Sequence, residues 1–191
     1  MGALRPFFCM GAFARPFLFG GIFVNRKVRY LTHAALIAAL YAVLTHLQNL
    51  LFPGSANFAI QFRVSEAMCV LAFFTPAAIP GLTVGCALYN LTFSGAMPLD
   101  PLIGSLATLL AAWGMWATRR IRAKKLPLLG LALPAVANAL LVGWELTLYF
   151  GQGFWLNAMY VAIGEIAVLY TLGIALYTTL SRKNLAARLF S

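Results

Sequence analysis

Residues 30–52 read YLTHAALIAALYAVLTHLQNLLF, and this stretch decides the class of protein to which the chain belongs. It contains no Asp, Glu, Lys or Arg, and most of its side chains are apolar. Coiled as an α-helix with a rise of about 1.5 Å per residue, it is longer than the roughly 30 Å hydrocarbon core of a bilayer. The stretch therefore predicts a helix that spans a membrane.

The composition of the whole chain supports the same class. Of its 191 residues, 62% are hydrophobic and only 9% are charged, whereas soluble domains are about half apolar and about a quarter charged. A globule of this size could not hide so much apolar surface from water, and a disordered chain would be far more polar. A soluble enzyme and a disordered protein are therefore excluded, and the length fits one domain of about six spans.

Five further apolar stretches complete an all-α integral membrane domain of six helices. We expect the spans at residues 30–52, 62–74, 79–96, 101–118, 126–150 and 155–180. The second and third are short and share a proline-rich joint at residues 75–81, so that either both are tilted half-depth helices or the joint is buried in protein. The predicted organisation is an N-terminal cytoplasmic or interfacial extension, a six-helix membrane domain and a basic cytoplasmic tail, at residues 1–29, 30–182 and 183–191.

Basic residues predict the orientation of this domain. The chain has 14 Lys and Arg against 4 Asp and Glu, with basic clusters at residues 25–29, 119–125 and 182–183. Because Lys and Arg accumulate on the cytoplasmic side of membrane proteins, both termini are expected in the cytoplasm. The positive charge then marks one side of the membrane and does not indicate a nucleic-acid partner. Arg63 is the exception and falls on the outer side.

The four acidic residues all fall in the outer half of the predicted spans: Glu66, Asp100, Glu145 and Glu165. Burying a carboxylate without a partner is costly, so ionisable groups inside a membrane are candidates for a binding site. Asp100 precedes Pro101 and is expected to cap the fourth span. Arg63 and Glu66 are three residues apart, and they either pair with each other or face a ligand.

The remaining acids have no basic neighbour in the sequence. Glu145 and Glu165 therefore contact either a ligand or a distant partner such as Arg63. Asn138 shares a helix face with Glu145, and the adjacent Trp144 either stacks on a flat ring or belongs to an interfacial aromatic belt. The candidate substrate-binding residues are Glu145, Glu66, Glu165, Asn90, Trp144, Arg63 and Asn138.

The first span also carries small residues at helical spacing. Ala34, Ala38 and Ala42 line one face, and Ala35 and Ala39 lie beside them. Small residues four apart let another helix approach closely in lipid. The face is predicted to dock a partner protein, although packing within one bundle uses the same spacing.

Several kinds of chemistry are missing from the sequence. It contains no G-x-x-x-x-G-K-[ST], no H-E-x-x-H and no nucleophile motif. The cysteines Cys9, Cys69 and Cys86 are odd in number and form no C-x-x-C, so we interpret them as buried thiols and expect no metal and no cofactor. A polar site facing outward without an energy-using motif indicates a capture subunit whose partners supply the energy, and not an enzyme.

Specific strings resemble a known transporter family. Residues 31–45 resemble the first helix of the substrate-binding S-components of energy-coupling-factor (ECF) vitamin transporters. Three strings resemble the QueT family in particular: FRVSEA at residues 62–67, FFTPAAIPGL at 73–82 and GSLATLL at 104–110. Single residues strengthen the resemblance, namely Gly85, Cys86, Asn90, Asp100, Pro134, Asn138 and Ala139. The resemblance covers about residues 27–182.

This resemblance implies a six-helix S-component in the bacterial cytoplasmic membrane that captures a queuosine precursor, a deazaguanine base, from outside. It also implies docking through the alanine face onto a membrane T-component with two cytoplasmic ATPases. An S-component for another vitamin or purine-like solute, a membrane assembly protein without transport and a membrane enzyme stay as alternatives.

A guanine-like ligand fits the acidic residues chemically. Its edge offers adjacent N–H donors, and one carboxylate can accept two of them through charge-assisted hydrogen bonds. Such bonds discriminate strongly in a dry site. We expect Glu145 to read this edge, with Glu66 as the second choice.

Overall fold

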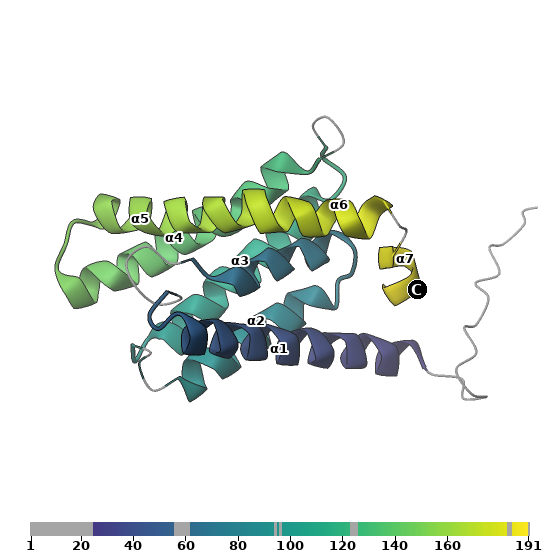
Figure 1. The fold of residues 1–191 in the computed structure, drawn as a ribbon, viewed down its shortest axis with the longest axis horizontal. Helices are drawn as coiled ribbons and strands as arrows, with labels where there is room; N and C mark the ends of the chain where they lie inside the picture. Colours follow the sequence, from purple (N-terminus) through teal and green to yellow (C-terminus); the bar gives the residue numbers. More distant parts are fainter. Residues whose placement is uncertain are drawn as a thin grey trace, which may run out of the picture.

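Every regular element in the described part of the chain is a helix, as the apolar sequence predicts (Figure 1). The structure is a computed structural model that describes residues 25–55, 62–93, 95, 97–122, 126–182 and 185–190. Its elements are α1 (Arg26–Leu51), η1 (Val64–Phe73), α2 (Ala78–Thr92), α3 (Asp100–Thr118), α4 (Leu128–Phe150), α5 (Phe154–Val168), η2 (Leu169–Gly173), α6 (Ile174–Arg182) and α7 (Leu185–Phe190). Most of the predicted N-terminal extension, residues 1–24, lies outside the described residues.

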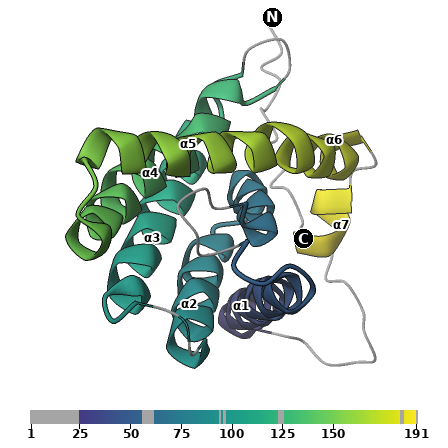
Figure 2. The same ribbon diagram turned by 60° about the vertical axis from the view of Figure 1, so that its left-hand side comes forward.

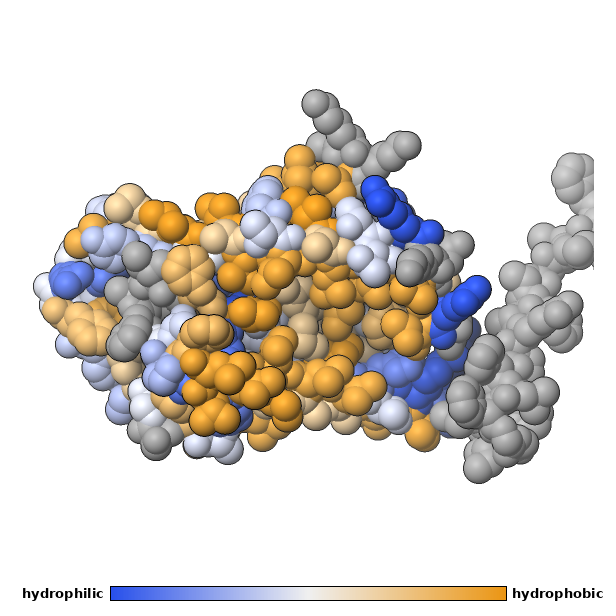
Figure 3. Space-filling view, viewed as in Figure 1, coloured by the Kyte–Doolittle hydropathy of each residue, from blue (hydrophilic) through white to orange (hydrophobic). Residues whose placement is uncertain are grey.

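Four helical segments are long and apolar enough to cross a membrane, namely α1, α3, α4 and the continuous rod formed by α5, η2 and α6. They match the predicted first, fourth, fifth and sixth spans. Leucines on the outside of α1 remain exposed, as expected for a helix that faces lipid. Figure 3 shows hydrophobic residues across the middle of the molecule, and it shows hydrophilic residues gathered mainly toward the ends. The chain is thus built as a multi-pass membrane protein.

The predicted second span is shorter than a bilayer and lies inside the bundle. The segment η1 is a 3₁₀-helix of ten residues, about 20 Å long at about 2 Å per residue. It packs against α1, α2, α3, α4, α5, η2 and α6, and Figure 2 shows it in the centre between α2 and the α5–α6 rod. Because protein and not lipid surrounds η1, its length need not match the bilayer. The joint after it is buried at Thr75, Ala77 and Ala78. Of the two predicted alternatives, tilted half-depth helices or a joint buried in protein, the structure therefore shows the buried joint.

The buried face of η1 forms the centre of the main apolar core. Cys69 and Val70 are fully buried there and pack in one cluster with Leu82, Met115 and Leu131 from three other helices. Cys86 belongs to the same cluster, so the prediction of buried thiols is confirmed for Cys69 and Cys86. Cys9 lies outside the described residues.

Part of the alanine face of α1 packs inside the chain, as in the alternative of packing within one bundle. A Cβ atom added to Gly81 would lie 2.7 Å from the Ala34 carbonyl oxygen, and one added to Gly85 would lie 2.8 Å from that of Ala38. The small residues of α1 and α2 therefore let the two backbones touch. Ala38 is only 5% exposed and packs against α2, so its side chain is not at the surface of this structure.

The five alanines thus divide into two groups. Ala34 and Ala42 are half-buried beside Ala38. Ala35 and Ala39 lie on the outer flank of α1 and are exposed. Only the outer pair is free to meet another helix, because the inner face is already covered by α2.

The predicted orientation gives a clear expectation for chemical labelling. Arg120 and Gln152 are both exposed, and they follow α3 and α4 respectively. If basic residues mark the cytoplasm, Arg120→Cys should react with a membrane-impermeant maleimide only after cells are lysed. Gln152→Cys should react in intact cells, and the unsubstituted chain supplies the background. The opposite pattern would reverse the topology.

Candidate functional site

A buried arginine stands at the start of η1. The Arg63 side chain is buried, and its guanidinium lies 5.8 Å from the centre of the Tyr89 ring, within the range of a cation–π contact. One guanidinium nitrogen also donates weakly to the Cys86 sulfur at 3.9 Å. Arg63 interacts electrostatically with Glu66, Glu165 and Glu145. The structure therefore brings one cation together with three of the predicted acids, which come from three different helices.

Glu66 is held by donors of the protein itself. Its carboxylate accepts a hydrogen bond from the Tyr41 hydroxyl at one oxygen. The other oxygen accepts one from the Cys69 thiol at 3.1 Å. Both oxygens are occupied and the side chain is fully buried, so Glu66 serves as a structural anchor between α1 and η1. This arrangement does not favour Glu66 as the second-choice ligand reader.

A polar stripe on α1, formed by Tyr41, Thr45 and Gln48, holds the beginning of η1. It was not among the predicted features. The Thr45 hydroxyl donates to the Ser65 oxygen at 2.7 Å, and the Gln48 carbonyl oxygen accepts from the Val64 N–H at 2.7 Å. The Gln48 amide nitrogen also donates to the Phe62 carbonyl. These contacts satisfy backbone groups that a helix start leaves unpaired. The signal was the helical spacing of polar residues 41, 45 and 48 within an apolar span.

Glu145 is the acid whose oxygens have no donor. The side chain is fully buried in α4, and neither oxygen of the ionised carboxylate has a hydrogen-bond donor among the described residues. Asp100 and Arg63 are the charged groups that act on it. Arg63 attracts its carboxylate, whereas Asp100 repels it when both acids are ionised and shares a hydrogen bond with it when one of the two is protonated. A buried polar group without a partner is unfavourable and rare. Glu145 is therefore the strongest candidate for an acceptor that a ligand satisfies.

Two more buried oxygens lack donors within the described residues: Asn90 Oδ1 and Glu165 Oε2. The Asn90 amide nitrogen donates to the Asp100 carbonyl at 3.0 Å, and the Asn138 amide nitrogen donates to Glu165 at 3.0 Å. The free atoms of this group, like those of Glu145, are all acceptors. The arrangement is thus complementary to a ligand that offers several N–H donors.

Gly104 is needed for the position of Asn90. A Cβ atom at residue 104 would lie only 2.8 Å from the Asn90 amide nitrogen. The missing side chain therefore lets Asn90 of α2 reach the start of α3. In the sequence, this glycine stands out only as part of the string GSLATLL at residues 104–110.

Asp100 differs from its predicted role as a helix cap. It is the first residue of α3, with Leu99 in the cap position. Its carboxylate accepts from the Met97 N–H at 2.7 Å. The side chain therefore closes the turn that leads into the helix, and it does not cap the helix itself.

The structure does not bring Trp144 to this group. Its side chain is 49% exposed on the outer surface of α4. Tyr149 on the same helix and Trp155 on α5 are exposed as well. Of the two predicted roles for Trp144, stacking on a flat ligand ring or lying in an interfacial aromatic belt, this exposure fits the belt. The aromatic residue at the site is Tyr89, which stacks on Phe93 at 5.4 Å and meets His46 edge-on at 4.9 Å. It was not among the predicted candidates.

The free acceptors are enclosed by packed side chains. Two cavities, of about 660 and 410 Å³, are lined by described residues, and neither is lined by Glu145, Glu165 or Asn90. Within the described ranges, no group of three His, Cys, Asp or Glu side chains is placed to hold a metal ion. The site consists of buried hydrogen-bonding groups around Arg63 at the junction of η1 with α2, α3, α4 and α5.

A protein-family model covers this whole region. The family model described as QueT transporter matches residues 31–182, which include every candidate residue named above. A similar curated protein is the "Queuosine precursor transporter QueT" of Lactococcus lactis subsp. cremoris (strain MG1363), 39% identical over 79 residues. That alignment covers 40% of this chain and 43% of the relative, so less than half of the relative's length is matched. No solved structure matches the chain. Since the family model spans most of the chain, the protein belongs to the QueT transporter family.

Proposed function

We propose that the chain is the substrate-binding subunit of an ECF-type importer and captures a queuosine precursor, a deazaguanine base, from outside a bacterial cell. The observation that carries the proposal is the set of buried acceptors without donors, above all both oxygens of Glu145. Membership of a transporter family supports a transport role. The name of the curated relative supports the substrate class.

The ligand's chemistry matches the free atoms. The amine and ring N–H of a guanine-like edge are adjacent donors, and Glu145 can accept both. Asn90 and Glu165 supply further acceptors, and Arg63 supplies donors for a ring carbonyl. Each of these bonds is worth more in a site without water, because the dielectric there is low.

The charges favour a base that carries an amine. The group contains one arginine and four acids, and none of the five is exposed. A cationic substituent would pair with a carboxylate of this group and favour its ionised form, whereas a neutral base would not. We therefore place aminomethyl-substituted deazaguanines ahead of neutral ones as ligands.

Ligand entry requires movement of the bundle. Glu145 is fully buried and neither described cavity contains it. We infer that α4 and the start of α3 separate on the predicted outer side to admit the base.

Uptake is proposed to need a T-component and two ATPases, with α1 as the docking helix. Ala35 and Ala39 leave room for a partner helix beside the exposed Leu31 and Val43. We expect Ala39→Trp to abolish uptake in cells that contain all partners, while the affinity for the base stays within about two-fold. Ala38→Trp is the contrast, because it enters the α1–α2 contact and should lower stability, binding and uptake together. Normal uptake with Ala39→Trp would remove this surface from the dock.

Binding to the purified full chain tests the function. Calorimetric titration with an aminomethyl deazaguanine should show saturable binding, and adenine is the control because its edge presents a different donor pattern. Binding of a different vitamin in place of the base would favour the alternative S-component. Absence of binding to every candidate, with normal folding, would favour an assembly role without transport.

A further inference from the structure

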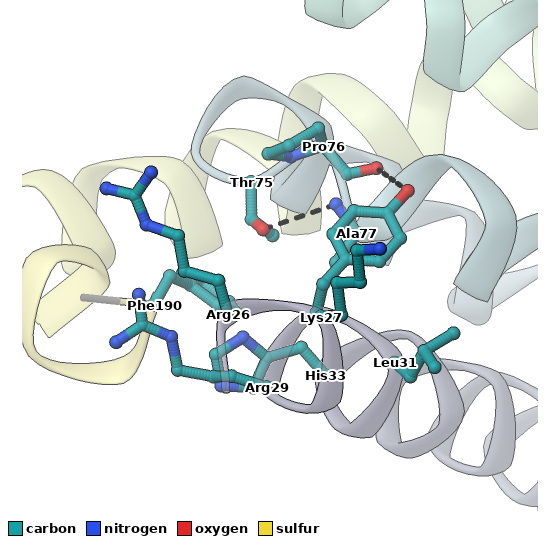
Figure 4. Close-up of a pocket in the computed structure, with 10 residues that line it drawn as sticks. Arg26, Lys27, Arg29, Leu31, His33, Thr75, Pro76, Ala77 and Phe190 are labelled. Atoms are coloured by element: carbon teal, nitrogen blue, oxygen red, sulfur yellow. Dashed lines mark hydrogen bonds between the residues drawn. The ribbon is translucent and has the colours of Figure 1, made fainter. Parts of the chain in front are cut away.

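A second site lies at the other end of α1. The larger cavity, of about 660 Å³, opens between the first turns of α1, the joint that follows η1 and the short helix α7 (Figure 4). Its lining residues are Arg26, Lys27, Arg29, Tyr30, Leu31, His33, Thr75, Pro76, Ala77 and Phe190. None of the groups proposed to bind the base belongs to it.

The polar part of this cavity is basic. Arg26, Lys27 and Arg29 carry positive charges, and all three are exposed. No acidic side chain is among the lining residues. In Figure 4 the side chains of Arg26 and Arg29 extend toward the same side of the cavity as Phe190, and Lys27 lies near Ala77. Such a cluster is suited to a phosphate group, since Arg and Lys both donate to phosphate oxygens.

The walls of the cavity come from three parts of the chain. The Tyr30 hydroxyl donates to the Pro76 carbonyl at 3.5 Å and so joins α1 to the joint. The Phe190 ring meets the His33 ring edge-on at 5.5 Å, which places α7 against α1. The joint is itself fixed by a hydrogen bond from the Ala77 N–H to the Thr75 hydroxyl at 3.3 Å. The cavity is therefore built by contacts between elements distant in the sequence.

The apolar part of the cavity leads onto the membrane surface of α1. Leu31 lines the cavity and is 64% exposed. Leu36 and Leu40 lie on another side of the same helix and are also exposed, so α1 presents apolar side chains to lipid around much of its surface. A ligand with a phosphate head and a hydrocarbon tail would match both parts, whereas a free phosphate would use only the basic one.

We propose that this cavity binds the headgroup of an anionic phospholipid, with its acyl chains entering the bilayer beside the exposed Leu31. The end of the molecule where the basic residues gather is the predicted cytoplasmic end, and the cytoplasmic leaflet is rich in anionic lipid that attracts such clusters.

The test compares lipids on the purified full chain. Native mass spectrometry in detergent should detect phosphatidylglycerol bound about ten-fold more tightly than phosphatidylcholine. The variant Arg26→Gln/Lys27→Gln/Arg29→Gln should lose that preference. The matched control is Arg120→Gln/Arg122→Gln/Arg182→Gln, which removes the same charge from exposed sites outside the cavity and should keep it. If the triple variant does not fold, Lys27→Gln alone can replace it. This single variant should lower the affinity for phosphatidylglycerol about three-fold.

Several outcomes would overturn the proposal. Equal binding of the two lipids, or equal losses in the two triple variants, would mean that general surface charge attracts the lipid. Competition by inorganic phosphate as effective as that by phosphatidylglycerol would indicate a site for a soluble anion. Unchanged lipid binding in the cavity variant, together with loss of a co-purifying T-component, would assign the cavity to a protein partner.

Discussion

Replacing Glu145 by Gln is expected to weaken binding of a deazaguanine base by about thirty-fold to a thousand-fold, which corresponds to about 2–4 kcal/mol. The substitution keeps the volume of the side chain but turns one acceptor oxygen into a donor that faces the N–H groups of the ligand. When Glu145 and Asp100 are both ionised, no described group donates to the Glu145 carboxylate, so most of the loss falls on the ligand. Calorimetric titration of the purified wild type and the variant measures the ratio.

The fold should tolerate this change. A neutral amide is easier to bury than a carboxylate without a donor, so the melting temperature of Glu145→Gln should equal or exceed that of the wild type. Glu66→Gln is the contrasting variant, because the Tyr41 hydroxyl and the Cys69 thiol both donate to Glu66. It should lower stability whether or not ligand is present.

Two results would contradict this assignment. Wild-type affinity in Glu145→Gln would remove Glu145 from the site. Wild-type affinity in both Glu145→Gln and Glu165→Gln would mean that the acids are structural, and the ligand would then have to be sought around Asn90 and Tyr89.

Replacing Gly85 by Leu is expected to cause the largest loss of stability, about 1–3 kcal/mol or more. Even its Cβ atom would lie 2.8 Å from both the Ala38 carbonyl oxygen and the Tyr41 Cβ atom. The obstacle is the backbone of α1, which cannot move aside as a flexible side chain could. The helices would have to separate, and Tyr41 would move away from Glu66. A lower melting temperature in detergent measures the effect.

Gly153→Leu is the matched control for this prediction. A Cβ atom at Gly153 would meet nothing within 4 Å, and its φ of −61° suits any residue. We expect it to change stability much less than Gly85→Leu does. Equal effects of the two variants would show that added bulk in general, and not the α1–α2 contact, determines the loss.

The class of the protein could be predicted from the sequence alone. The uncharged stretch at residues 30–52 and the low charged fraction require a membrane, because water cannot accommodate that much apolar surface. The predicted first, fourth, fifth and sixth spans agree with the long helices. The four acids Glu66, Asp100, Glu145 and Glu165 also stood out in the sequence, since charge is rare and costly in such a chain.

The direction of each helix face could not be predicted in the same way. In a soluble helix the apolar side points to the core, but in a membrane both the core and the lipid side are apolar. The alanines of α1 therefore had no pattern to separate Ala38, which meets α2, from Ala39, which is exposed. Only the packing of α2 against α1 decided between them.

The role of each acid was decided by contacts between distant segments. Tyr41 reaches Glu66 from 25 residues away, and Asn138 reaches Glu165 from 27 residues away. Scarcity of charge marked the acids as important in the sequence, but it carried no information about which donors the fold brings to each. The tertiary structure supplies donors to both oxygens of Glu66, to one oxygen of Glu165 and to neither ionised oxygen of Glu145. A buried carboxylate whose oxygens already have donors is structural, whereas one without donors is available to a ligand.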